Sequence, residues 1–191
     1  HVNALRPTSR SLFGQTVGIV GMGRIGQAVA DRLDGFGVRV IFADPFQDGL
    51  KTVKQNRRCV DLVTLLTESD VVTLHLPLTE ATRCLIDRRE LARMKPGAII
   101  VNTARGGLIN EAALCEALNA GRLAGAGLDV FEQEPQPADT PLSRFNNVVL
   151  TPHIAAGTRD ALEQKFTAIF ENLQRFFRGE TLRYAVDPDG T

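Results

Sequence analysis

The sequence is poor in the residues that make disulfide frameworks and metal sites. It has no tryptophan, one tyrosine and only three cysteines among 191 residues. Cys59, Cys84 and Cys115 are odd in number and far apart, which excludes a disulfide framework and the closely spaced ligand pairs of a zinc site. We therefore expect reduced thiols, a cytoplasmic location and no bound metal.

An excess of either charge and long apolar runs are also missing. Lys+Arg and Asp+Glu both number 22, so the formal net charge is zero. A balanced charge gives no general attraction to nucleic acid or to an acidic membrane. No apolar run approaches the roughly 18 residues of a membrane span, and no signal peptide is visible. The expected partners are small molecules or other proteins, with no nucleic acid and no membrane.

What the sequence does contain is a regular alternation of strand-like apolar runs and helical periodicity. The expected strands are residues 16–21, 38–44, 70–78, 98–104, 124–130 and 147–153. The expected helices are residues 25–37, 60–69, 87–95, 110–121 and 156–178. Such β-α-β alternation argues for a parallel sheet covered by helices on both faces. The predicted fold class is α/β, a doubly wound parallel sheet.

The turn after the first expected strand is rich in glycine. Its sequence GMGRIG places Gly21, Gly23 and Gly26 between the strand and the first helix. In a dinucleotide-binding turn the first glycine allows the tight bend, the second lets the backbone approach a pyrophosphate, and the third lets helix and strand pack closely. The phosphates then lie at the positive end of the helix. The alternative is a βαβ unit whose glycines serve packing only.

An acidic residue in the right place favours the dinucleotide interpretation. Asp44 ends the second expected strand, about 20 residues further on, where the fingerprint has a carboxylate for the ribose hydroxyls. This carboxylate would repel a 2′-phosphate, and no arginine follows it directly. We therefore predict NAD rather than NADP.

Polar residues follow the later strands. Arg105 follows the fourth expected strand, Asp129 ends the fifth, Glu134 lies just beyond it, and His153 follows the sixth. In a sheet of strand order 3-2-1-4-5-6, ligands bind beyond the carboxyl ends of the strands, near the switch between strands 1 and 4. We expect these four residues on the edge that carries the glycine turn. His75 ends the third expected strand, on the far side of the switch, and is expected to be structural.

His153, Glu134 and Arg105 are together the residue types of an acid–base site. A histidine with a carboxylate partner is the recurring arrangement for a general acid–base, and the fork of an arginine binds a carboxylate or polarises a carbonyl. The alternative is a structural role for each: a hydrogen-bonded His153, a solvated Glu134 and an Arg105 that covers a turn. Convergence beside a dinucleotide site favours catalysis.

Five segments carry a resemblance to a known family: TVGIVGMGRIG, LHLPLTEATRCLI, MKPGAIIVNTARGGLINEAAL, GAGLDVFEQEP and LTPHIAAGT. Over nearly the whole chain they resemble the cofactor domain of the D-isomer-specific 2-hydroxyacid dehydrogenases. The resemblance implies a Rossmann NAD-binding domain and hydride transfer between NAD and a D-2-hydroxy acid/2-oxo acid pair. It implies that Arg105 binds the 2-oxo acid, that His153 is the general acid–base, and that Glu134 raises the proton affinity of the histidine. Formate dehydrogenases resemble this pattern but carry Gln at the Glu134 position, so Glu134 argues against a formate dehydrogenase.

The same resemblance implies a set of cofactor contacts. Arg24 and Ile25 would meet the pyrophosphate, and Asp44 the adenosine ribose. Leu76, Pro77 and Thr82 would lie on the cofactor's adenosine and phosphate side. Thr103 and Ala104 would line the nicotinamide pocket, and Asp129 would meet the carboxamide. Arg105 is also expected to contact the cofactor.

The resemblance also implies that much of an enzyme is absent from this chain. The family forms its substrate cleft with a second domain, built mainly from residues that precede the cofactor region. We expect residues 1–13 to be the end of the interdomain connecting segment. Residues 14–191 are expected to form the dinucleotide-binding domain with a long C-terminal helix, in the family directed toward the substrate domain. A homodimer through the cofactor domain is the expected assembly.

A second class of function stays open at this stage. The same fold and trio occur in the C-terminal-binding-protein corepressors, which resemble these dehydrogenases and use NAD occupancy to control protein assembly. The acid is open as well. Lactate, glycerate, glyoxylate or hydroxypyruvate, phosphoglycerate and bulkier 2-oxo acids all fit the resemblance, because residues outside this chain read most of the substituent beyond C2.

Overall fold

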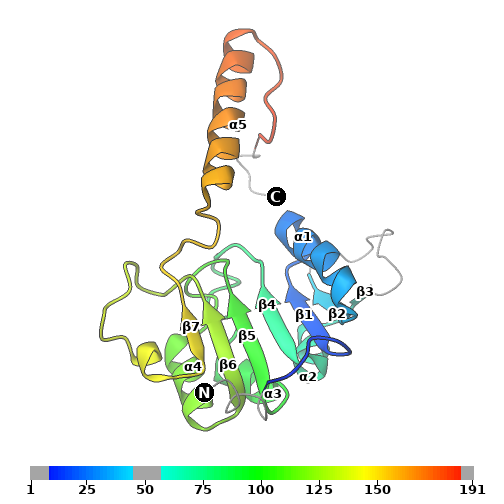
Figure 1. The fold of residues 1–191 in the computed structure, drawn as a ribbon, viewed down its shortest axis with the longest axis vertical. Helices are drawn as coiled ribbons and strands as arrows, with labels where there is room; N and C mark the ends of the chain where they lie inside the picture. Colours follow the sequence, from blue (N-terminus) through cyan, green and yellow to red (C-terminus); the bar gives the residue numbers. More distant parts are fainter. Residues whose placement is uncertain (1–8, 45–56, 186–191) are drawn as a thin grey trace. The chain divides into compact units, whose positions relative to one another are not determined.

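The computed structural model describes residues 9–44 and 57–185. The chain divides into two compact units between Pro152 and His153. The first unit holds the sheet and the second holds the C-terminal helix, as Figure 1 shows. Most of the predicted connecting segment, residues 1–8, lies outside the described residues, and the predicted domain limits stay a prediction.

The first unit is built on one sheet of seven parallel strands in the order β3-β2-β1-β4-β5-β6-β7. The strands are β1 Thr16–Val20, β2 Arg39–Ala43, β3 Arg57–Cys59, β4 Val71–Leu74, β5 Ala98–Asn102, β6 Leu123–Leu128 and β7 Val148–Leu150. The predicted doubly wound α/β class is thus confirmed. Because every pair is parallel, all carboxyl ends meet at one edge, and chain order reverses between β1 and β4.

Strand β3 corrects the predicted strand count. Its sequence, Arg-Arg-Cys, has none of the apolar character that marks a strand in a sequence. The run expected as the third strand is therefore β4, which pairs with β1. His75 follows β4 and lies directly at the switch, so its predicted place on the far side was wrong.

The helices begin close to their predicted starts because side chains cap them. Asp61, Asn110 and Thr158 each accept a hydrogen bond from the third backbone N–H of the helix that follows. The elements are α1 Arg24–Leu33, the 3₁₀ turn η2 Asp34–Phe36, α2 Leu62–Glu68, α3 Arg88–Arg93, α4 Glu111–Asn119, the 3₁₀ turn η3 Pro141–Arg144 and α5 Arg159–Phe177.

The two faces of the sheet are covered unequally. A large core cluster joins one face of the sheet to α2, α3 and α4, and a smaller one packs α1 against β1 and β2. On the α1 side of β5 and β7, Ile99 is 39% exposed and Val149 is 67% exposed. The expectation of a sheet covered on both faces therefore holds only in part.

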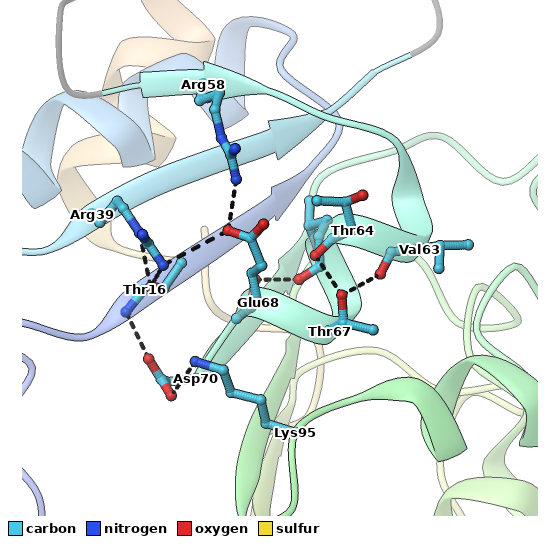
Figure 2. A network of polar contacts seen from close by, with 11 residues as sticks. Thr16, Arg39, Arg58, Val63, Thr64, Thr67, Glu68, Asp70 and Lys95 are labelled. Carbon is cyan, nitrogen blue, oxygen red and sulfur yellow. Dashed lines mark hydrogen bonds and ion pairs between the residues drawn. The ribbon is translucent and has the colours of Figure 1, made fainter.

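A polar network ties the amino ends of the strands together (Figure 2). Asp70 accepts from the backbone N–H of Thr16 at 2.8 Å and pairs with the Lys95 ammonium at 2.9 Å. Burial acts to raise the pKa of Asp70, but these two partners outweigh it and lower the pKa. Glu68 pairs with Arg58 at 2.6 Å across β3 and α2. This network lies opposite the carboxyl edge and has a structural role.

The second unit is dominated by α5, predicted as residues 156–178 and observed as 159–177. None of its residues is buried. Leu162, Phe166, Ile169, Phe170 and Leu173 recur at helical spacing and are all about half exposed. No helix in the described part of the chain is long and apolar enough to cross a membrane.

Candidate active site

The glycine turn after β1 has the geometry that its sequence predicts. Gly21 has φ +93°, and a Cβ on it would lie 2.6 Å from the carbonyl oxygen of His75. A Cβ on Gly26 would overlap the carbonyl oxygen of Gly21. Both positions therefore require glycine: Gly21 for its backbone conformation, and Gly26 for the close packing of α1 on the turn.

Gly23 differs from its neighbours in having open space around it. It is the N-cap of α1, and its Cβ position meets no described atom within 4 Å. No side chain caps α1, and its first turn holds no acidic residue. Arg24 and Ile25, the first residues of α1, are exposed. The backbone N–H groups at this helix start thus fit an anionic group such as a pyrophosphate.

Asp44 is fixed to this turn by a hydrogen bond. Its Oδ2 accepts from the backbone N–H of Met22 at 2.7 Å. The carboxylate at the end of β2 therefore lies beside the glycine turn, where a ribose carboxylate is expected. The residues directly after Asp44, 45–56, lie outside the described part.

The segment after β4 lines the other side of the switch. A Cβ on Gly21 would lie 2.8 Å from a methyl carbon of Leu76, so the two loops touch. Thr82 donates to the carbonyl of Pro77 at 2.7 Å and accepts from the N–H of Thr79 at 2.8 Å. The Thr82 hydroxyl thus also shapes its own loop. Burial lowers the pKa of His75, which therefore favours the neutral imidazole.

The segment after β5 is shaped by Asn102, whose side chain is buried. Its amide nitrogen donates to the carbonyl of Arg105 at 2.9 Å, and its oxygen accepts from the N–H of Ala104 at 3.0 Å. Thr103 and the Arg105 side chain are exposed at the carboxyl edge. Asn102 was not identified from the sequence. The one sequence feature that points to it is an amide side chain at the end of an apolar run, where burial is expected.

The segment after β6 presents two carboxylates in different surroundings. Asp129 is 3% exposed and accepts from the hydroxyl of Thr151 at 2.6 Å. Glu134 is exposed, and its Oε1 accepts from the N–H of Phe131 at 3.0 Å. Glu134 therefore folds back on its own loop and is held there.

The structure gathers most of the predicted residues at one edge. The segments that hold Gly21–Gly26, Leu76–Thr82, Thr103–Arg105 and Asp129–Glu134 all leave carboxyl ends of neighbouring strands. His153 is the first residue of the second unit, so its distance from Arg105 and Glu134 stays a prediction. The described residues hold no group of three His, Cys, Asp or Glu side chains placed for a metal.

Comparison with known proteins agrees with this geometry. Residues 2–155 match the family model for the NAD-binding domain of D-isomer specific 2-hydroxyacid dehydrogenases. A glyoxylate reductase of Korarchaeum cryptofilum is 48% identical over 169 residues, which are 88% of this chain and 51% of that protein. A D-3-phosphoglycerate dehydrogenase of Mycobacterium tuberculosis is 44% identical over 179 residues, 94% of this chain and 34% of that one. The chain spans a third to a half of these curated relatives.

Solved structures share the fold. D-lactate dehydrogenase with NAD⁺ from Lactobacillus jensenii superposes with a TM-score of 0.87 at 32% identity, covering 94% of this chain and 57% of that one. NAD-dependent formate dehydrogenase from Staphylococcus aureus in complex with NAD gives a TM-score of 0.86 at 34% identity. The match covers 98% of this chain and 56% of that one.

Proposed function

Because this chain belongs to the D-isomer specific 2-hydroxyacid dehydrogenases, as their NAD-binding domain, we propose that it is the cofactor domain of a longer enzyme that transfers hydride between NAD and a D-2-hydroxy acid/2-oxo acid pair. One observation carries the proposal. The Arg105 and Glu134 segments leave the same sheet edge as the glycine turn, two and three strands from β1. A ligand in that turn therefore has a cation and a carboxylate nearby.

On the cofactor side, we assign the pyrophosphate to Gly21, Gly23 and Gly26 with Arg24 and Ile25. The open space at Gly23 and the uncapped start of α1 support this assignment. Asp44 would hold the adenosine ribose, which favours NAD over NADP. The other proposed contacts are Leu76, Pro77, Thr82, Thr103, Ala104, Arg105 and Asp129.

On the substrate side, the proposal gives each of three residues one role. Bound NAD supplies the hydride acceptor. Neutral His153 takes the hydroxyl proton as C2 loses its hydride, so that the hydroxy acid becomes a 2-oxo acid. The Glu134 carboxylate favours the imidazolium that forms. In the reverse direction protonated His153 donates to the carbonyl oxygen, while Arg105 binds the acid and stabilises charge that develops on that oxygen.

Wider properties of the whole enzyme are proposed from the family. We infer a homodimer formed through the cofactor domain and a cytoplasmic location. The relatives are named for different acids, among them glyoxylate and phosphoglycerate. A small 2-oxo acid is therefore the proposed substrate class.

The proposal is tested by NADH oxidation in the full-length enzyme with a panel of 2-oxo acids, beside its His153→Ala variant. We expect turnover of at least one acid, a loss of at least about 100-fold in kcat in the variant, and unchanged NADH affinity. NADH binding without turnover of any acid would refute the proposed reaction and favour an NAD-dependent protein-binding role. Equal loss of NADH binding and turnover in a folded variant would contradict the role of His153.

A further inference from the structure

The peptide group between Phe131 and Glu132 lies in the middle of the Glu134 loop and is held from two sides. On one side it faces Gly106, where an added Cβ would overlap the Phe131 carbonyl and come within 2.9 Å of the Glu132 nitrogen. On the other, the Glu132 N–H donates to Oε1 of Glu111 at 2.6 Å. This one peptide group therefore lies between Gly106, in the segment of Arg105, and Glu111, at the start of α4.

Glu111 and Glu132 complete the contact by a reciprocal bond. The backbone N–H of Glu111 donates to Oε1 of Glu132 at 2.9 Å, so each residue binds the N–H of the other. Asn110 caps the same helix through the N–H of Ala113. The start of α4 is thus satisfied by Asn110 from its own segment and by Glu132 from the Glu134 loop.

The next amide along the chain holds the proposed partner of the histidine. The Phe131 N–H donates to Glu134 Oε1 at 3.0 Å, and the Phe131 side chain is 5% exposed. Consecutive amides therefore bind Glu134 and Glu111. Because a peptide group is planar, a rotation that released the Glu132 N–H would also turn the Phe131 carbonyl, which lies beside Gly106. The backbone that binds Glu134 is therefore also bonded to Glu111.

The carboxylates of Glu111 and Glu132 repel each other, which argues that the pair serves more than stability. Burial raises the pKa of Glu111, the Glu132 carboxylate raises it further, and the Glu132 N–H acts to lower it. The thiol of Cys115, one turn along α4, is another titratable group that interacts with Glu111. Two neighbouring carboxylates are a poor choice for stability alone, although the start of a helix favours negative charge.

We propose that Glu111 is a positioning residue for the dehydrogenase reaction, and that its bond to the Glu132 N–H sets the loop conformation in which Glu134 meets the catalytic histidine. This inference rests on the proposed function. Glu111 touches neither substrate nor cofactor in this proposal; it acts through the peptide group between Phe131 and Glu132.

The test compares Glu111→Ala and Glu111→Gln in the full-length enzyme. Alanine removes the acceptor, whereas glutamine keeps a carbonyl oxygen for the Glu132 N–H. We expect Glu111→Ala to lower kcat about tenfold, since small misplacement of catalytic groups is costly. The KM for NADH should stay within about twofold, and the alkaline limb of the pH–rate profile for reduction should move to lower pH. Glu111→Gln should restore kcat and the profile.

Glu116→Gln is the matched control, because Glu116 lies on the same helix and pairs at the surface with Arg88. We expect its kcat and pH profile to equal those of the unchanged enzyme. Unchanged kcat in Glu111→Ala would overturn the inference. Equal loss in Glu111→Ala and Glu111→Gln would overturn it too, because the acceptor would then be irrelevant.

A second measurement is independent of turnover. Amide hydrogen exchange of the peptide that contains residues 128–136 should be faster in Glu111→Ala than in the unchanged full-length enzyme, and unchanged in Glu111→Gln. If the unchanged enzyme turned over no acid while exchange behaved in this way, the proposed function would fail and the loop coupling would stand. Equal exchange in all three proteins would refute the coupling itself.

Discussion

The glycine turn after β1 and the loops after β5 and β6 are fixed in different ways. The turn is fixed mainly by close backbone packing, with Gly26 on the carbonyl of Gly21 and Gly21 on the carbonyl of His75. The loops after β5 and β6 are fixed largely by side chains that bond to the backbone: Asn102 holds the loop after β5, and Glu111 binds the Glu132 N–H in the loop after β6. The glycine turn thus depends on positions where the backbone leaves no room for a side chain, and the two later loops depend largely on side chains that bond to the backbone.

This difference implies different responses to mutation. A turn that requires glycine, because its backbone packs too closely for a side chain, is disrupted by a substitution that adds a Cβ. A loop that depends on hydrogen-bonding side chains is broken by removing them. Four substitutions test the contrast.

The largest effect is expected at Gly26. A Cβ there overlaps the backbone of Gly21, which cannot move aside as a side chain can. We expect Gly26→Ala to lower the free energy of unfolding by about 3 kcal/mol, measured by urea denaturation. Gly35→Ala is the control, since its Cβ position is open; it should change stability by less than about 1 kcal/mol. Equal effects in both would show that the turn is not limited by backbone packing.

Asn102 is the corresponding test of the β5 loop. Asn102→Ala leaves the carbonyl of Arg105 and the N–H of Ala104 without their partner. We expect a loss of about 2 kcal/mol in the free energy of unfolding and a lower affinity for the 2-oxo acid. Asn147→Ala removes a single bond to the carbonyl of Ala124 at an exposed site. If Asn147→Ala lowered the free energy of unfolding as much as Asn102→Ala, the two bonds of Asn102 would have no special role in holding the loop after β5.

Gly23 separates binding from stability within the turn. Its Cβ position meets nothing, so Gly23→Ala should change the free energy of unfolding by less than about 1 kcal/mol. The added methyl group occupies the space assigned to the pyrophosphate. We expect at least about tenfold weaker NADH binding by fluorescence titration, equal to about 1.4 kcal/mol. Unchanged affinity would place the pyrophosphate elsewhere.

The smallest expected effect is the pH dependence of Glu111. Its folded-state pKa is raised, mainly by burial, so the neutral form is favoured in the folded protein. The contribution of Glu111 to stability is therefore fully present below the unfolded pKa of the carboxyl group and is lost as pH rises through the folded pKa. In Glu111→Gln the side chain stays neutral at every pH and keeps a carbonyl oxygen that can accept from the Glu132 N–H.

Thermal unfolding from pH 4 to pH 7 measures this effect. Glu111→Gln should match the unchanged protein at the acidic end and exceed it by a few tenths of a kcal/mol at neutral pH, because solvent screens the partly exposed group. A variant that is less stable at pH 7 would contradict the raised pKa.

The sequence predicted what its local patterns encode. Strand and helix alternation identified six of the seven strands within a few residues, and the glycine pattern predicted the tight turn after β1. Strand β3 was missed because Arg-Arg-Cys pairs with β2 at the sheet edge without apolar side chains. That omission misplaced His75, although β4 itself was recognised.

The contacts that support the loops after β5 and β6 could not be predicted from the sequence. Glu111 and Glu132 are 21 residues apart, and each reads as an ordinary surface carboxylate. Only the pairing of β5 with β6 brings the two segments together. Asn102 stands in a recognisable motif, but its two hydrogen bonds depend on how the loop after it folds back.

The reversal of chain order between β1 and β4 also affects the kinetics of folding. Val17 pairs with Val71, 54 residues along the chain, whereas every other strand pairing joins residues 17 to 28 apart. Closing that longest loop has the highest entropic cost, so we expect the β1–β3 and β4–β7 halves to form first and join last. A dinucleotide at the proposed site would contact both halves and would bind only after they have joined. Bound NAD should therefore slow unfolding while leaving the folding rate nearly unchanged.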